Sequence, residues 1–219
     1  MTTPLTGSAF DSLLLDAVTD QQALRQVYEL PKATAVRKQL TELTHQAQQL
    51  IGCSSLVLVA SVDAEGNCDV SPRGGPAGFV AVLDERTVAI PDATGNKRLD
   101  TLRNVIATGR AGLLFVVPGR TTTLRVNGRA CVSTRPELLR QLTAVGKPPA
   151  SALVVGIEEV YPHCPKSLLR GGAWKPERWL PADAQPTSAE VTLAQLRMPG
   201  LTIADIERAE EESLKYRYE

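Results

Sequence analysis

Aromatic residues, histidines and clustered cysteines are all scarce in this chain of 219 residues. Phe, Trp and Tyr make up 4% of it, so Leu, Val, Ile and Ala must build the core. The four cysteines form no C-x-x-C pair, which excludes the usual zinc and dithiol motifs. Only two histidines, His45 and His163, could act as further metal ligands. The sequence therefore predicts no metal site.

Neither sign of charge dominates, and long hydrophobic runs are missing. Lys plus Arg and Asp plus Glu number 24 each, and this balance argues against nucleic-acid binding, which normally needs a basic excess. No apolar run reaches membrane-spanning length. The N-terminus lacks the basic and then apolar segments of a signal peptide. We therefore expect a soluble, cytoplasmic protein that binds neither nucleic acid nor membrane.

Helical patterns occupy both ends of the chain. Residues 31–52 begin with proline and end with glycine, and their apolar residues recur every three or four positions, which predicts a helix. Residues 202–219 are typical of a charged terminal helix. We expect an N-terminal helical region, residues 1–53, that packs on a central domain, residues 54–180. A linker and helical tail, residues 181–219, complete the chain.

The central region has the pattern of short β-strands. Turn signals such as Asp63-Ala64-Glu65-Gly66-Asn67 and Pro118-Gly119 separate its apolar runs. Asn127-Gly128 is a further turn signal and splits residues 121–134 into two predicted strands. Two helices interrupt the series, the second of them at residues 135–147. About seven short strands predict a mostly β fold with flanking helices, an antiparallel barrel or sandwich.

The stretch from Ile90 to Arg110 suggests an anion site. We expect a helix with Lys97 and Arg98 in its first turn, Leu99, Leu102 and Ile106 facing inward, and Gly109 as its stop. Cations at a helix N-terminus oppose the helix dipole, which costs roughly 0.3–1 kcal/mol each. A phosphate bound at this turn would remove that cost. The alternative is that both side chains extend into solvent.

Other residues add to what a phosphorylated, planar cofactor would need. Ser71, Arg73 and Gly74 end a strand with a hydroxyl, a guanidinium and a residue that permits close backbone approach. Arg125 places a charge inside another predicted strand, and Arg129 follows two residues after Asn127-Gly128. Each of these could also be an ordinary exposed residue.

The order of these motifs resembles the pyridoxamine-5'-phosphate-oxidase-like flavoproteins. D-x-SPRG, IPD-x-x-GN-x-RLDTLRN, GLLFVVPG, LRVNGRA and HCPKSLLR…W follow one another between Val36 and Trp179. The resemblance implies a six-stranded antiparallel split β-barrel that forms a homodimer, with one FMN in each of two clefts between the subunits. The tail lacks the Arg- and His-rich segment of the true oxidases, which argues against vitamin B6 oxidation.

The resemblance also implies roles for particular residues. Ser71, Arg73 and Gly74 would line the isoalloxazine ring. The ribityl phosphate would lie beside Asn96, Lys97 and Arg98, with Arg125 near the same end.

The loop YPHCPKSLLRGGAW, residues 161–174, carries several reactive groups. In an extended chain His163 and Cys164 point to opposite faces, so they do not form a catalytic pair. We expect Lys166, Ser167 and Arg170 to close over the cofactor, and Trp174 to pack against the flavin ring or the dimer partner. The alternative is a turn that merely closes the barrel.

The function expected from the resemblance is an FMN-dependent oxidoreductase. It would pass hydride or electrons through the flavin to or from a small-molecule substrate or electron donor, and no side chain need act as an acid or base. One alternative is a flavin-binding protein without turnover, acting as a carrier, store or sensor. A deazaflavin- or haem-binding split barrel is another, with His163 as the axial haem ligand.

Overall fold

The computed structural model describes residues 8–93, 95, 97–142 and 148–217. The chain divides into two compact units, Met1–Lys38 and Gln39–Glu219. The first unit contains α1 (Ala9–Leu13), a 3-10 turn (Leu14–Asp16), α2 (Gln21–Val27) and α3 (Ala33–Arg37). None of its described residues is buried within the unit. Packing of the N-terminal helices on the barrel stays a prediction.

The helix predicted for residues 31–52 is interrupted. After α3, Leu40 pairs with Val160 through two backbone hydrogen bonds as an isolated β-bridge. A new helix, α4 (His45–Gly52), then begins at Thr44, whose hydroxyl accepts a hydrogen bond from the Ala47 amide. The prediction of one continuous helix was wrong because strand pairing at Leu40 outweighs the helical spacing of the apolar residues.

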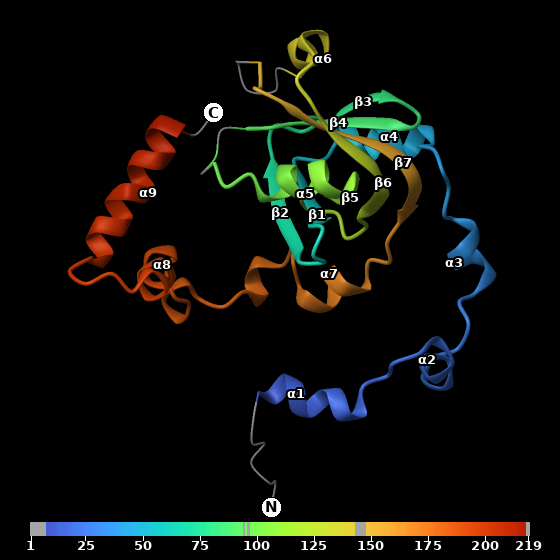
Figure 1. Cartoon of the computed structure of the whole chain (residues 1–219), viewed down its shortest axis with the longest axis horizontal. Coiled ribbons are helices and arrows are strands. Elements are labelled where there is room, and N and C mark those ends of the chain that lie inside the picture. The colour runs from blue at the N-terminus through green and yellow to red at the C-terminus, as the bar shows by residue number, and fades with distance from the viewer. Residues whose placement is uncertain (1–7, 94, 96, 143–147, 218–219) are drawn as a thin grey trace, which may run out of the picture. The chain divides into compact units, whose positions relative to one another are not determined.

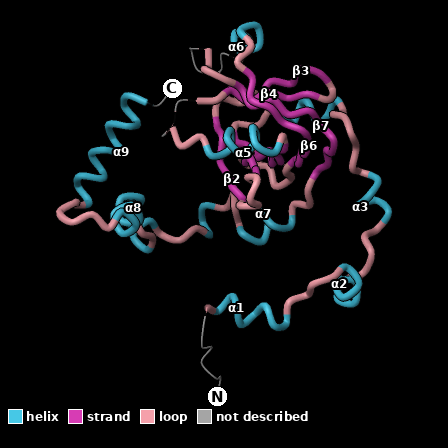
Figure 2. The backbone as a smooth tube through the Cα atoms, in the orientation of Figure 1, coloured by secondary structure: helices cyan, strands magenta, loops and turns pink. Residues whose placement is uncertain are grey.

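Seven strands form one antiparallel sheet in the described part of the chain (Figures 1 and 2). They are β1 (Leu56–Val62), β2 (Cys68–Gly74), β3 (Ala81–Asp84), β4 (Thr87–Pro91), β5 (Arg110–Val116), β6 (Leu124–Ser133) and β7 (Ala152–Pro162). Their order is β2-β1-β5-β6-β7-β4-β3, so the sheet curls without closing and leaves β2 and β3 at its edges. The predicted antiparallel split barrel with flanking helices is confirmed, with seven strands in place of six.

The core lies between the concave side of the sheet and α5 (Asp100–Thr108), which contacts β1, β2, β5 and β6. Leu102 and Val105 of this helix are buried, together with Phe115 and with Val57 and Val59 of β1. The expectation that Leu99 and Ile106 face inward was wrong, since both are exposed. The helix starts at Asp100, so its buried face runs through residues 101, 102 and 105. Gly109 ends the helix with a left-handed φ of 66°, as predicted.

Residues 121–134 do not form two strands as predicted. β6 continues through Asn127-Gly128, which is a β-bulge in the pairing with β7 and not a turn. The bulge leaves Glu158 of β7 without a directly opposite residue. At this point the backbones approach so closely that a Cβ atom on Gly128 would overlap the carbonyl oxygen of Gly156. The glycine that resembles a turn signal is required by this contact.

The remaining helices follow the strands. They are α6 (Pro136–Gln141), α7 (Lys166–Gly171), the 3-10 turns Pro176–Arg178 and Ala182–Ala184, α8 (Ser188–Leu196) and α9 (Ile203–Arg217). A capping box between Thr187 and Glu190 starts α8, which contacts α9 and has Ala189 buried. Among the helices of the described residues, none has the length and apolar content needed to cross a membrane.

We predict that Gly128→Ala lowers the free energy of unfolding by about 3 kcal/mol, because the added methyl group forces the backbones of β6 and β7 apart. Urea denaturation of both proteins would measure the change. Gly52→Ala is the control, since a Cβ atom there meets nothing within 4 Å. Equal losses in the two variants would contradict the close approach at Gly128.

Candidate functional site

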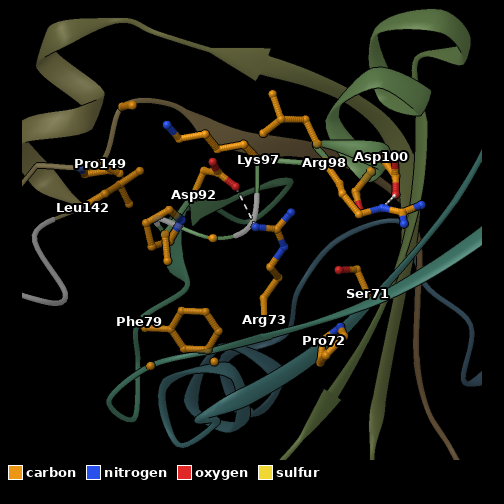
Figure 3. A pocket seen from close by; sticks show the side chains of 18 of the residues that line it. Ser71, Pro72, Arg73, Phe79, Asp92, Lys97, Arg98, Asp100, Leu142 and Pro149 are labelled. Carbon is orange, nitrogen blue, oxygen red and sulfur yellow. Dashed lines mark hydrogen bonds and ion pairs between the residues drawn. The ribbon is translucent and has the colours of Figure 1, made fainter. Parts of the chain in front are cut away.

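A cleft with a volume of about 720 Å³ lies at the open side of the barrel (Figure 3). Strand β2 forms one wall and the chain from Pro91 to Thr101 forms another. Gly75, Phe79, Leu142 and residues 148–150 complete the lining. The cleft therefore combines segments from opposite ends of the strand order.

Strand β2 presents one polar face to the cleft. Asp69, Ser71 and Arg73 alternate with exposed residues along it, as the two-residue period of a strand requires. Pro72, which lacks a backbone N–H group, is tolerated between them because β2 is an edge strand. Half of the backbone positions of such a strand face no neighbouring strand and need no hydrogen-bond donor. The hydroxyl of Thr101 donates to the Asp69 carboxylate at 2.8 Å and ties the start of α5 to this wall.

An ion pair joins the two walls. Nη1 of Arg73 lies 2.6 Å from Oδ1 of Asp92, and the two side chains are only 21% and 16% exposed (Figure 3). Asp92 directly follows β4, and its amide donates to the Ser151 carbonyl at 3.0 Å. That backbone bond continues the β4–β7 pairing and places the carboxylate inside the cleft.

The chain before α5 adopts an uncommon conformation. Lys97 and Leu99 have φ angles of 64° and 60°, in the left-handed region that non-glycine residues seldom occupy. The helix begins only at Asp100, so the prediction that Lys97 and Arg98 occupy its first turn was wrong. They lie in the loop before it, and an aspartate complements the helix dipole. The backbone strain is of the kind that gathers at ligand sites.

The charges of the cleft balance among the described residues. The cations are Arg73, Lys97 and Arg98, and the anions are Asp69, Asp92 and Asp100. Nε of Arg98 lies 2.8 Å from Oδ2 of Asp100, but these side chains are 75% and 40% exposed. In the part of the chain that the structure describes, Lys97 is in no ion pair. Lys97 can therefore pair with a bound anion, and the ion pair of Arg98 with Asp100 is exposed enough for water to screen it.

Apolar side chains form the opposite side of the cleft from Arg98 and Asp100. Phe79, Leu142 and Pro149 lie there, with the Arg73–Asp92 pair between the two sides (Figure 3). Phe79 is also part of the main core and only 5% exposed, so its ring position is fixed by packing. The backbone of Gly75 passes close to this ring. The arrangement suits a ligand that has a flat apolar part and an anionic part.

Comparison with known families gives this site a context. A family model described as pyridoxamine 5'-phosphate oxidase matches residues 43–164, more than half of the chain. The chain belongs to the pyridoxamine 5'-phosphate oxidase family. The match confirms the resemblance drawn from the motifs. It covers every strand of the sheet and ends before α7.

Solved structures similar to this family member include HupZ of Group A Streptococcus, with 21% identity, a TM-score of 0.46, and coverage of 55% of this chain and 93% of the other. A putative pyridoxamine 5'-phosphate oxidase from Lactobacillus delbrueckii has 26% identity, a TM-score of 0.43, and coverage of 56% and 95%. An FMN-binding protein from Syntrophomonas wolfei has 12% identity, a TM-score of 0.41, and coverage of 65% of this chain and 96% of the other. Curated proteins provide no match.

The structure places the predicted site residues in two groups. Ser71, Arg73, Gly74, Lys97 and Arg98 all line the cleft. Asn96, predicted beside them, lies outside the described residues. The other predicted residues do not line this cleft as described, and they come from β6, α7 and the segment after it: Arg125, Lys166, Ser167, Arg170 and Trp174.

This second group lies at the other end of β7. Residues just before Ala152 line the cleft, whereas α7 follows Pro162 at the other end of this strand. Arg125 donates to the Tyr161 hydroxyl at 3.2 Å, and its guanidinium lies 5.8 Å from the centre of that ring. The indole of Trp174 donates to the Arg120 carbonyl at 2.7 Å. Lys166 and Ser167 begin α7 and are not in the loop that the sequence predicted.

The sequence prediction missed the carboxylates and the apolar side of the cleft. Asp69 could have been found, because it precedes Ser71 and Arg73 at the same two-residue spacing. Asp92 stands in the motif IPD-x-x-GN-x-RLDTLRN, to which no role for this carboxylate was attached. Leu142 and Pro149 carry no local signal, since only the packing of distant segments brings them to the cleft.

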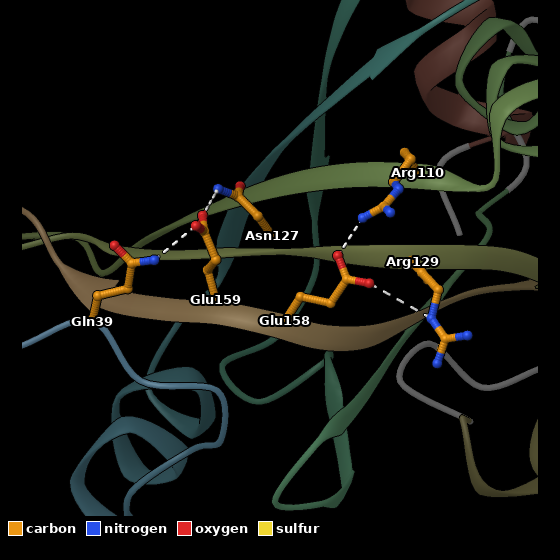
Figure 4. Close-up of polar contacts among 6 residues, drawn as sticks. All are labelled: Gln39, Arg110, Asn127, Arg129, Glu158 and Glu159. Atoms are coloured by element: carbon orange, nitrogen blue, oxygen red, sulfur yellow. Dashed lines mark hydrogen bonds and ion pairs between the residues drawn. The ribbon is translucent and has the colours of Figure 1, made fainter.

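A second cavity, of about 680 Å³, lies over β1, β5, β6 and β7. Its polar groups satisfy one another: Glu158 pairs with Arg110 and Arg129, and Glu159 accepts hydrogen bonds from Gln39 and Asn127 (Figure 4). The bulge in the β6–β7 pairing lies beside both glutamates. The described residues contain no group of three potential metal ligands in either cavity.

Proposed function

We propose that this protein is an FMN-dependent oxidoreductase that holds the flavin in the cleft between β2 and the start of α5. The observation that supports this most is that two exposed cations, Lys97 and Arg98, line the same cleft as a set of apolar side chains. Lys97 and Arg98 suit a phosphate through charge-assisted contacts. Phe79, Leu142 and Pro149 suit the apolar part of an isoalloxazine ring.

The tasks of the chain in this function are binding and orientation. Bound FMN would supply the hydride or electron transfer. Ser71 and the backbone at Gly74 would contact the ring from β2, and Asn96 would lie with Lys97 at the phosphate. The buried wall around Phe79 would exclude water from one side of the ring. None of the described cleft residues is assigned as a catalytic acid or base.

The charge balance of the cleft supports a homodimer with FMN at the subunit interface. The three cations of the cleft match its three carboxylates, so one chain offers no net positive charge to a phosphate dianion. Arg125, Lys166 and Arg170 do not line the cleft of their own subunit as described. A two-fold dimer would bring them, with Ser167 and Trp174, to the partner's cleft.

The cysteines support a cytoplasmic location. All four are free and exposed, which suits a reducing compartment.

The first test is the visible absorption spectrum of the purified protein, with identification of what denaturation releases. We expect a flavin spectrum and free FMN. NADH or NADPH should then reduce and bleach the flavin, and oxygen from air should reoxidise it. In the proposed function a small-molecule substrate or electron donor takes the place of one of these two reagents. A flavin that stays inert toward every donor would favour a carrier, store or sensor. A Soret band, or a released deazaflavin, would overturn the FMN proposal.

We predict that Lys97→Ala and Arg98→Ala each weaken FMN binding by about 1–3 kcal/mol, because each removes a charge-assisted contact to the phosphate. The exposure of Arg98 places its effect at the lower end of that range. Riboflavin, which lacks the phosphate, should bind equally well to all variants. Fluorescence titration with both flavins measures this. Arg103→Ala is the matched control, since this exposed arginine of α5 does not line the cleft.

If each cleft is formed by both subunits, we predict that mixing two variants that each bind FMN poorly restores part of the FMN binding. Lys97→Ala/Arg98→Ala damages the cleft of its own chain, and Arg125→Ala/Lys166→Ala damages the cleft of the partner. A mixed dimer then has one intact cleft. Random subunit exchange should therefore recover about a quarter of the FMN capacity of the wild type. Recovery equal to the average of the two separate variants would contradict the exchange of residues between subunits.

A further inference from the structure

We propose that Asp92 is a positioning residue of the flavin cleft, which holds Arg73 across the opening of the barrel and cancels its charge. This inference rests on the proposed FMN function. It assigns Arg73 a different role from Lys97 and Arg98: Arg73 does not bind the phosphate, and it does not act as a free cation beside the flavin. The consequence is a flavin that is harder to reduce than it would be next to an unpaired guanidinium.

The burial of the pair separates Arg73 from the other cations. The Arg73 and Asp92 side chains are 21% and 16% exposed, whereas Arg98 and Asp100 are 75% and 40% exposed. Water screens an exposed pair, so Arg98 can exchange its partner for a phosphate. Separating the partly buried pair would leave an uncompensated charge in a less solvated site than that of Arg98. Arg73 therefore keeps its carboxylate when a ligand binds.

The position of the pair explains its structural effect. Arg73 comes from β2, the edge strand at one end of the sheet order, and Asp92 follows β4, next to the other edge strand. The two strands share no backbone pairing. The side-chain contact therefore spans the opening of the split barrel, and the Ser151 carbonyl holds the Asp92 backbone on its side. The pair sets the width of the cleft as well as its charge.

The effect on a flavin follows from electrostatics. Reduction places negative charge on the ring system, so a nearby cation stabilises the reduced form and a nearby carboxylate destabilises it. Arg73 and Asp92 lie between Arg98 on one side of the cleft and Phe79, Leu142 and Pro149 on the other, the region that a flavin bound across the cleft would occupy (Figure 3). Together they contribute little net charge there. Removing the carboxylate would leave the full charge of Arg73.

The test compares the midpoint potential of bound FMN in wild type and in Asp92→Asn, by equilibrium reduction against a reference dye. We expect reduced FMN to gain about tenfold in affinity relative to oxidised FMN, which raises the potential of this two-electron couple by about 30 mV. Asp92→Glu should restore the value of the wild type. Asp84→Asn is the control, because it removes the same charge at the far end of the β3–β4 hairpin.

The outcomes separate the inference from the function on which it rests. Wild-type protein that binds no FMN overturns both. Bound FMN with the same potential in Asp92→Asn and wild type overturns the role of Asp92 alone. If Asp92→Asn does not fold, the double variant Arg73→Gln/Asp92→Asn is compared with Arg73→Gln. The inference expects the higher potential in the double variant, and equal potentials overturn it.

Discussion

The pairing of β6 with β7 is the interaction on which the rest of the structure depends. These two strands join the β2-β1-β5 half of the sheet to the β4-β3 half, and no other strand pair connects the halves in the described chain. One half carries Ser71 and Arg73, and the other carries Asp92. The cleft exists only because the long ladder between β6 and β7 holds the halves in register. The contact at Gly128 allows that ladder to continue past its bulge.

The cleft combines two kinds of ion pair with different consequences. A buried pair fixes geometry, since its separation would expose uncompensated charge to a poorly solvated site. An exposed pair is weak and exchangeable, since water and salt screen it. The partly buried pair of Arg73 with Asp92 is closer to the first kind, and the exposed pair of Arg98 with Asp100 is of the second kind. In the proposed function the first pair shapes the site, and the second releases a cation to the cofactor.

Membership of the pyridoxamine 5'-phosphate oxidase family, shown by the match over residues 43–164, does not imply the activity of that name. The Arg- and His-rich tail of the true oxidases is absent from residues 188–219, and the described part of this region contains α8 and an acidic α9. The proposal of a flavin oxidoreductase therefore rests on the chemistry of the cleft. The identity of the substrate depends on the groups that face the ring from both subunits of the proposed dimer.

The sequence by itself determined the strand segments, the end of α5 at Gly109, the family, and five residues that line the cleft. These features depend on local patterns: the two-residue period of β2, the turn chemistry and the order of short motifs. Only the tertiary structure decided that Asn127-Gly128 is a bulge, that Leu40 forms a bridge, and that Arg73 pairs with Asp92. Each of these features depends on a backbone segment or a charged side chain that is distant in sequence. Local propensity does not predict such a contact.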